Sequence, residues 1–137
     1  MVQSLAILNL TPDSFSDGDT AMLEPELALA RAQELLARGA DYIDIGAEST
    51  RPGASSVSTE EELARLIPFL ELVKDQGSTF NGRLSLDSRN SQVLRKVFKE
   101  YGQYFTFIND VMGLQSNNML SIIAEFTNPG VRLISMH

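Results

Sequence analysis

The sequence predicts an α/β protein with a parallel sheet, because short apolar runs alternate with longer amphipathic stretches. A strand pattern followed by a helix pattern occurs four times, and a fifth strand pattern closes the chain. This alternation is typical of parallel strands joined by helical crossovers. Two architectures fit it, the open doubly wound sheet and the eight-stranded barrel. No G-x-G-x-x-G motif follows the first strand, which disfavours dinucleotide binding.

The first strand–helix unit has clear boundaries. LAILNL, residues 5–10, is a short apolar run that leads into turn residues, which predicts a strand. The amphipathic stretch 24–39 predicts a helix, since Pro25 suits its first turn and Gly39 suits the position past its end. YIDIG, residues 42–46, then predicts the second strand.

The second helix starts at a capping box. Ser58 with Glu61 three residues later is the signature of a helix N-terminus, and we expect this helix to run to about Val73. Gly77 ends the region, and RLSLD, residues 83–87, predicts the third strand.

The last part of the chain repeats the pattern. We expect a third helix over 91–102 that Gly102 closes, and a fourth strand over 104–110. A short fourth helix is expected over 118–126, where NPG stops it, and a fifth strand over 131–137.

Composition restricts the classes of protein that remain. The 137 residues favour one domain, and 43% hydrophobic with 21% charged residues is ordinary globular composition. Without cysteine, and with His137 as the one histidine, sites of several thiolates or imidazoles are excluded. A net charge of −7 without a basic run argues against nucleic-acid binding. No apolar run is long enough for a membrane span and no signal peptide is evident, so we expect a cytoplasmic protein.

Polar residues stand toward the carboxyl end of every predicted strand, where parallel α/β proteins bind ligands. The alternative is that these residues merely begin turns. The set consists of Asn9, Asp44, Asp87, Asn109 with Asp110, and His137.

Two loops offer groups that bind anions and cations. Arg51 can grip phosphate oxygens in a fork, and Ser49 and Thr50 can donate to the same oxygens. Asn9 and Asp13 offer the oxygen ligands that Mg²⁺ prefers beside a phosphate. The alternative for the arginine is a surface position in a turn made by the following proline and glycine.

Asp87 and Asn109 close adjacent strands. A carboxylate beside a carboxamide can read the donor and acceptor edge of a flat heterocycle, and a buried carboxylate needs a donor partner. The alternative is that Asp87 or Ser88 caps the helix that follows.

Four segments together resemble the dihydropteroate synthase family. They are NLTPDSFSDG, DIGAESTRPGA, SLDSRNSQV and INDV, in the order and spacing of that family, from Asn9 to the end of the fourth strand. The resemblance implies that 1–137 is a pterin-binding domain, the N-terminal portion of a (β/α)₈ barrel. It also implies the reaction of 6-hydroxymethyl-7,8-dihydropterin pyrophosphate with p-aminobenzoate, with Mg²⁺, to give dihydropteroate and pyrophosphate, and a target of sulfonamides.

The resemblance also assigns roles in the first loop. Asn9 is expected to bind the metal and pyrophosphate. Asp13 and Asp17 belong to the catalytic loop that folds over the site, and Phe15 packs against the aminobenzoate. This explains why the apolar strand opens into a polar loop with one phenylalanine. In this family the C–O bond is thought to break before attack, so the protein must stabilise the departing pyrophosphate and a cationic pterin.

Further roles fall on the later segments. Thr50 is expected to contact pyrophosphate, and the catalytic Arg51 with Pro52 to shape the aminobenzoate pocket. Asp87 and Asn109 are expected to bind pterin, and Asp44 to support the loops from beneath.

The chain departs from the family pattern in extent. A barrel of this kind takes roughly 250 residues, and the later family motifs, including a lysine and an Arg-x-His, are absent from these 137 residues. We therefore expect a homodimer or completion of the sheet by a further segment. Ser88 replaces the usual threonine and Asp19 a usual glycine.

Three functions remain open from the sequence. The first is a dihydropteroate synthase acting on small molecules. The second is a pterin-binding relative such as a pterin-dependent methyltransferase, although the first two segments favour the synthase because methyl transfer has no pyrophosphate to hold. The third is a non-catalytic half-barrel that serves as an assembly subunit.

Overall fold

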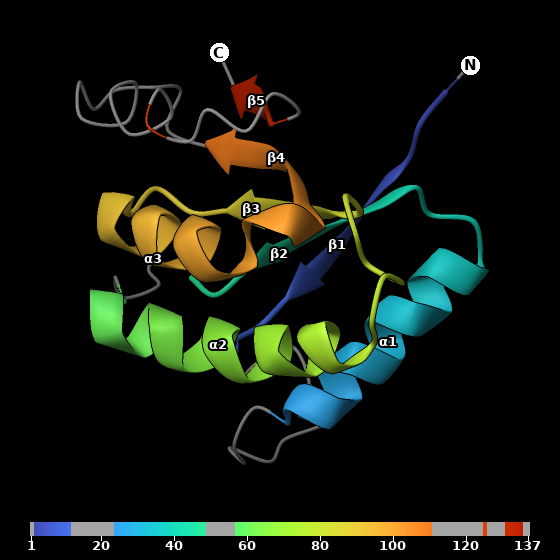
Figure 1. The fold of residues 1–137 in the computed structure, drawn as a ribbon, viewed down its shortest axis with the longest axis horizontal. Coiled ribbons are helices and arrows are strands. Elements are labelled where there is room, and N and C mark those ends of the chain that lie inside the picture. The colour runs from blue at the N-terminus through green and yellow to red at the C-terminus, as the bar shows by residue number, and fades with distance from the viewer. Residues whose placement is uncertain (1, 12–23, 49–56, 111–124, 126–130, 136–137) are drawn as a thin grey trace.

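Five parallel strands form one sheet (Figure 1) in the computed structural model, which describes residues 2–11, 24–48, 57–110, 125 and 131–135. The strands are β1 (Leu5–Asn9), β2 (Tyr42–Gly46), β3 (Leu84–Asp87), β4 (Phe105–Asp110) and β5 (Arg132–Ser135). Their order in the sheet is their order in the chain, and each pairs in parallel with the next. A doubly wound sheet reverses its strand order at a switch point. The sequential order in the described sheet is that of a partial (β/α) barrel.

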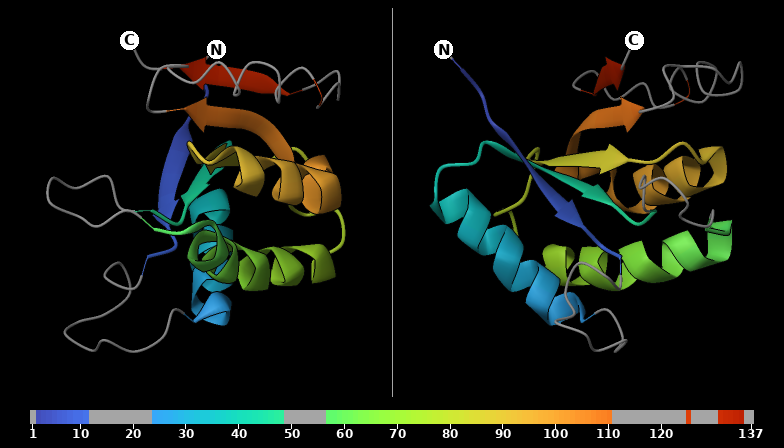
Figure 2. Two further views of the ribbon diagram at one scale, coloured as in Figure 1. Left: turned by 90° about the vertical axis from the view of Figure 1, so that its left-hand side faces the viewer. Right: turned by 180° about the vertical axis from the view of Figure 1, so that it is seen from behind.

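In the described part of the chain, helices cover one face of this sheet (Figure 2). They are α1 (Pro25–Ala37), α2 (Thr59–Asp75) and α3 (Ser91–Tyr101). No helix in the described ranges is apolar over a stretch long enough to cross a membrane.

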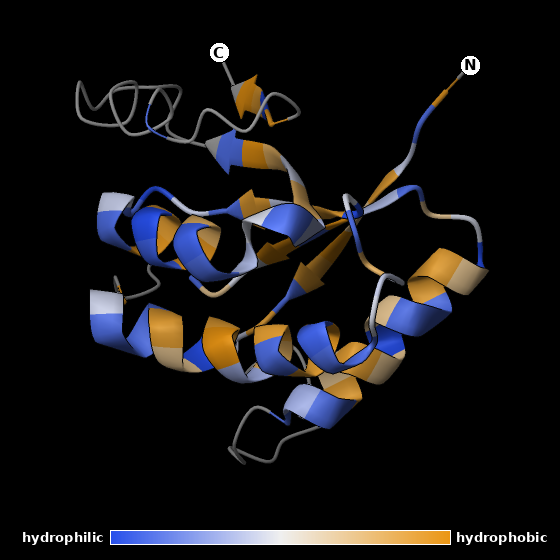
Figure 3. Cartoon of the chain, in the orientation of Figure 1, coloured by the Kyte–Doolittle hydropathy of each residue, from blue (hydrophilic) through white to orange (hydrophobic). Residues whose placement is uncertain are grey.

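The core lies between the helices and the sheet. One row of paired residues runs across the first four strands and is buried almost completely, namely Leu8, Ile45, Leu86 and Ile108. Buried helix residues such as Leu66, Phe69 and Val97 belong to the same cluster. Figure 3 shows hydrophobic strands behind α3, whose outward side is hydrophilic. Since side chains alternate along a strand, the intervening residues point to the other face of the sheet.

Helix ends agree with the predicted signals at several points. The Ser58 side chain accepts a hydrogen bond of 3.1 Å from the Glu61 backbone N–H, which confirms the N-terminus of α2. This helix continues to Asp75, beyond the expected end. Gly39 and Gly77 follow α1 and α2 with φ of 107° and 65°, a conformation that favours glycine.

Three expectations need correction or stay open. The N-cap of α3 is Asn90, whose side chain accepts from the backbone N–H groups of Gln92 and Val93, so neither Asp87 nor Ser88 caps this helix. Gly102 opens a 3₁₀ turn, η2 (Gly102–Tyr104), and β4 therefore starts at Phe105. Of the helix expected over 118–126, only residue 125 is described.

Candidate functional site

Four residues form a straight row across the carboxyl ends of the first four strands. The parallel register pairs each with the next, in the order Asn9, Gly46, Asp87, Asn109. Each of them directly follows a residue of the buried row in the chain. Because side chains alternate along a strand, they occupy the face of the sheet opposite the helices. The sequence prediction that Asn9, Asp87 and Asn109 meet at one edge is thereby confirmed in its geometry.

Asp44 lies one row below this edge, in the middle of β2 rather than at its end. It is only 3% exposed. Its carboxylate accepts a hydrogen bond of 2.6 Å from the Ser85 hydroxyl and one of 3.0 Å from Nδ2 of Asn109. Burial raises the pKa of Asp44, and the hydrogen bonds from Ser85 and Asn109 partly oppose that rise.

The contact with Asp44 fixes the amide of Asn109. Because Nδ2 donates to the carboxylate, Oδ1 must point the other way. This oxygen is buried, and no residue in the described part of the chain donates to it. A buried acceptor without a donor costs free energy. Asn109 therefore has a buried acceptor oxygen for which the described residues supply no donor.

Gly46 brings the backbone of β2 close to Asp87. A Cβ placed on Gly46 would lie 3.3 Å from both Cβ and the carbonyl oxygen of Asp87, and 3.4 Å from Oδ2. Such distances are tighter than ordinary van der Waals contacts. The glycine thus gives the Asp87 side chain room over the neighbouring strand.

Ser85 and Gly46 are contributors that the sequence analysis did not single out. The alternation of side chains along a strand could have found Ser85, because it stands two residues before Asp87 and shares its face. Gly46 occupies the end position of YIDIG, opposite Asn9, and only the strand register reveals this neighbour.

Several predicted site residues lie outside the described ranges. They are Asp13, Phe15, Asp17, Thr50, Arg51, Pro52 and His137. Their expected roles in the loop, the pyrophosphate contact and the aminobenzoate pocket remain predictions.

The donors at the edge suit a hard cation in their chemistry. Asn9 is exposed at the end of β1 and offers an amide oxygen, and Asp87 in the same row offers a carboxylate. Oxygen donors of this kind are the ligands that Mg²⁺ prefers. Within the described ranges, no cluster of three or more acidic or histidine side chains lies in place to hold a metal alone. Magnesium usually completes its shell with water and substrate phosphate, so these residues fit it.

The sequence matches a known family along nearly its whole length. A family model described as pterin binding enzyme matches residues 5–137. The dihydropteroate synthase of Neisseria meningitidis serogroup C is 42% identical over 132 residues, which are 96% of this chain and 44% of that protein. The chain therefore spans less than half the length of this relative.

Solved structures agree with the match in sequence. The dihydropteroate synthase of Xanthomonas albilineans, determined with 4-aminobenzoic acid, superposes with a TM-score of 0.81 at 39% identity, over 98% of this chain and 46% of the other. That of Clostridium difficile, determined in the presence of pteroic acid, gives 0.80 at 37% identity, over 98% and 48%. The partial barrel and its row of polar residues thus occur in a chain that is similar to dihydropteroate synthases.

Proposed function

Because the chain belongs to the family of pterin-binding enzymes, we propose that its open sheet edge binds the pterin substrate of a dihydropteroate synthase. The proposed reaction condenses 6-hydroxymethyl-7,8-dihydropterin pyrophosphate with p-aminobenzoate to give 7,8-dihydropteroate and pyrophosphate in folate biosynthesis. The chain would contribute the N-terminal portion of the barrel, and the cysteine-free composition suits the cytoplasm that the sequence suggests.

One observation carries the proposal. Asp44 holds the Asn109 amide so that its buried oxygen faces away from Asp44, and Asp87 stands beside Asn109 in the same row. A pterin presents N–H donors along one edge of a flat ring. An amide oxygen and a carboxylate side by side match two such donors.

The residues of this chain then perform three tasks. Asn109 and Asp87 bind the ring and fix its orientation for the reaction. The carboxylate of Asp87 would also offset positive charge that develops on the ring as pyrophosphate leaves. Asp44 keeps Asn109 in place before substrate arrives.

The expected residues of the two loops complete the proposal. Asn9 would hold Mg²⁺, which neutralises charge on the pyrophosphate when bound. Thr50 would bind the pyrophosphate, while Arg51, Pro52 and Phe15 would enclose the aminobenzoate. Asp13 and Asp17 would act in the loop that covers the site. The match to dihydropteroate synthases and the NLTPDSFSDG and DIGAESTRPGA segments support these assignments.

A further protein segment is part of the proposal. Among the described strands, β1 and β5 each pair on one side only. On the face away from the helices, Ile7 is 69% exposed. A second copy or a further segment would cover this face, because solvent-exposed apolar surface and unpaired strand edges favour association.

The test separates binding from catalysis. The chain is titrated with 6-hydroxymethylpterin in a calorimeter, and pyrophosphate release is followed with pterin pyrophosphate, p-aminobenzoate and Mg²⁺. We expect pterin binding that Asp87→Ala and Asn109→Ala abolish, with weak or absent turnover by the 137 residues alone. Binding without turnover after association with a completing segment would favour the non-catalytic pterin-binding protein. No pterin binding would overturn the proposal.

A further inference from the structure

Glu62 is a buried acid in a position where its neighbours are exposed. The first turn of α2 carries three consecutive glutamates. Glu60 and Glu61 face solvent, whereas Glu62 is 1% exposed and points toward the sheet. Negative charge near a helix N-terminus is favourable on the surface, but that benefit does not require burial.

The carboxyl group of Glu62 binds Ser88, the residue that follows Asp87. The Ser88 hydroxyl donates to Oε1 of Glu62 at 2.6 Å and accepts from the Asn90 backbone N–H at 3.1 Å. The second carboxyl oxygen, Oε2, is buried and has no hydrogen-bond donor among the described residues. Burial raises the pKa of Glu62. A buried carboxyl oxygen without a hydrogen-bond partner costs free energy.

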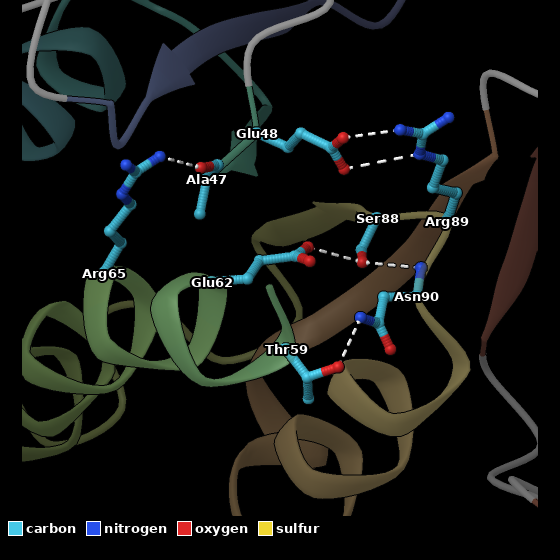
Figure 4. A network of polar contacts seen from close by, with 8 residues as sticks. All are labelled: Ala47, Glu48, Thr59, Glu62, Arg65, Ser88, Arg89 and Asn90. Atoms are coloured by element: carbon cyan, nitrogen blue, oxygen red, sulfur yellow. Dashed lines mark hydrogen bonds and ion pairs between the residues drawn. The ribbon is translucent and has the colours of Figure 1, made fainter. Parts of the chain in front are cut away.

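Two further side chains on the same face of α2 also form hydrogen bonds to the segments that follow β2 and β3 (Figure 4). Thr59 and Arg65 stand three residues before and after Glu62, and this spacing places all three on one side of the helix. The Thr59 hydroxyl accepts from Nδ2 of Asn90 at 2.8 Å, and the Arg65 guanidinium donates to the carbonyl of Ala47 at 2.8 Å. This face of α2 therefore holds the backbone just after both β2 and β3.

The two backbone segments that α2 contacts directly follow residues of the row at the carboxyl ends of the strands. Ala47 follows Gly46, and Ser88 follows Asp87. An ion pair of 2.6 Å between Arg89 and Glu48 also ties the segments to each other. A Cβ placed on Gly46 would lie 3.3 Å from Cβ of Asp87, so the ends of β2 and β3 are close together here. Because Ser88 is bonded directly to Asp87 in the chain, a shift of Ser88 also shifts the Asp87 carboxylate.

We propose that Glu62 is a positioning residue for pterin binding, which anchors Ser88 and so sets the place of the Asp87 carboxylate. The inference rests on the function proposed above. Stability alone does not account for this contact, because Asn90 already caps α3 and an apolar side chain would fill the space without a buried carboxyl group. The bond from Ser88 to Glu62 constrains the first of the two residues between β3 and the Asn90 cap.

The test compares three substitutions in the chain by calorimetric titration with 6-hydroxymethylpterin and by thermal melting. Glu62→Leu removes the anchor, and we expect pterin affinity to fall about tenfold, as sub-ångström misplacement of a binding group costs. Glu62→Gln keeps an acceptor for Ser88 and should bind within about twofold of the unsubstituted chain. Glu61→Leu, on the same turn but exposed, is the matched control and should bind normally.

Ser88 supplies a second route if Glu62→Leu does not fold. Ser88→Ala should weaken pterin binding to a similar extent, and Ser88→Thr, which retains the hydroxyl, should restore it. Across the Glu62 and Ser88 variants, we expect no correlation between melting temperature and pterin affinity. If the contact served stability alone, the two quantities would fall together.

The outcomes distinguish the two proposals. If the unsubstituted chain binds no pterin, the proposed function and the role of Glu62 both fail. If it binds and Glu62→Leu and Ser88→Ala bind equally well, the role of Glu62 alone fails. Affinity that falls only in proportion to melting temperature also overturns the positioning role.

Discussion

Asp44 and Asn109, which are 65 residues apart in the chain, are joined by a 3.0 Å hydrogen bond between the carboxylate and the side-chain amide. Asp44 lies in the middle of β2 and Asn109 near the end of β4, so the bond passes diagonally beneath the edge where Asp87 stands. A carboxylate accepts and does not donate when ionised. The bond therefore decides which way the Asn109 amide faces, and with it which ligand group Asn109 can recognise.

Replacement of Asp44 by alanine should weaken pterin binding by about tenfold or more, because Asn109 loses the acceptor that orients it. Asp44→Asn keeps one acceptor oxygen and should lose less. The measurement is the dissociation constant for 6-hydroxymethylpterin, taken well below the melting temperature of each variant. Ser85→Ala removes the other hydrogen bond to Asp44 and leaves the one to Asn109, so it is the control. Equal loss in all three variants would contradict the assigned role.

A methyl group at residue 46 should displace Asp87. The Cβ of Gly46→Ala would stand 3.3 Å from Cβ of Asp87 and must push it aside by a few tenths of an ångström. We expect pterin affinity to fall several-fold while the melting temperature changes little, since alanine is favoured over glycine in a strand by roughly 0.5–1 kcal/mol.

Gly102→Ala is the matched control for that experiment. Its added Cβ would meet the Phe98 ring at 3.9 Å, an ordinary contact. The residue precedes the start of β4, whereas Asp87 pairs with Asn109 near the end of that strand. Normal pterin affinity in Gly46→Ala would show that Asp87 does not depend on the space that the glycine leaves.

Local sequence signals were sufficient to predict most of the described helices and strands. Apolar runs, the Ser58 cap and the glycines at 39 and 77 located the described elements to within a few residues. The choice between an open sheet and a barrel needed the strand order, which depends on contacts between distant segments and leaves no mark in local periodicity.

The sequence predicted several residues of the site but not the hydrogen bonds that hold them in place. Strand ends pointed to Asn9, Asp87 and Asn109, and the register places them in one row. Glu62 gave no signal, because in sequence it is one of three similar acids at the start of a helix. Its burial depends on the rotation of α2 against the sheet, which packing sets.

Asn90→Ala should lower the free energy of unfolding by about 1–2 kcal/mol, the usual cost of a lost N-cap. The Asn90 side chain accepts from the backbone N–H groups of Gln92 and Val93 and donates to Thr59, and alanine removes all three bonds. Asn90→Asp keeps the cap oxygen and should stay close to the unsubstituted chain. Urea unfolding measures both. If Ser88→Ala cost more than Asn90→Ala, the helix would depend on Ser88 for its cap instead.

The buried carboxyl groups of Asp44 and Glu62 should make the chain less stable as pH rises. Burial raises the folded-state pKa of each above its ordinary value of 3.8 or 4.5. The native state therefore holds protons that the unfolded state releases, so their contribution to stability is full below the ordinary pKa and is lost as pH rises through the raised one. Glu62→Gln cannot ionise, and its melting temperature should fall less than that of the unsubstituted chain from about pH 4.5 toward neutrality. Glu61→Gln, exposed on the same turn, should follow the unsubstituted chain. Parallel curves for Glu62→Gln and the unsubstituted chain would mean that Glu62 titrates alike in the folded and unfolded states.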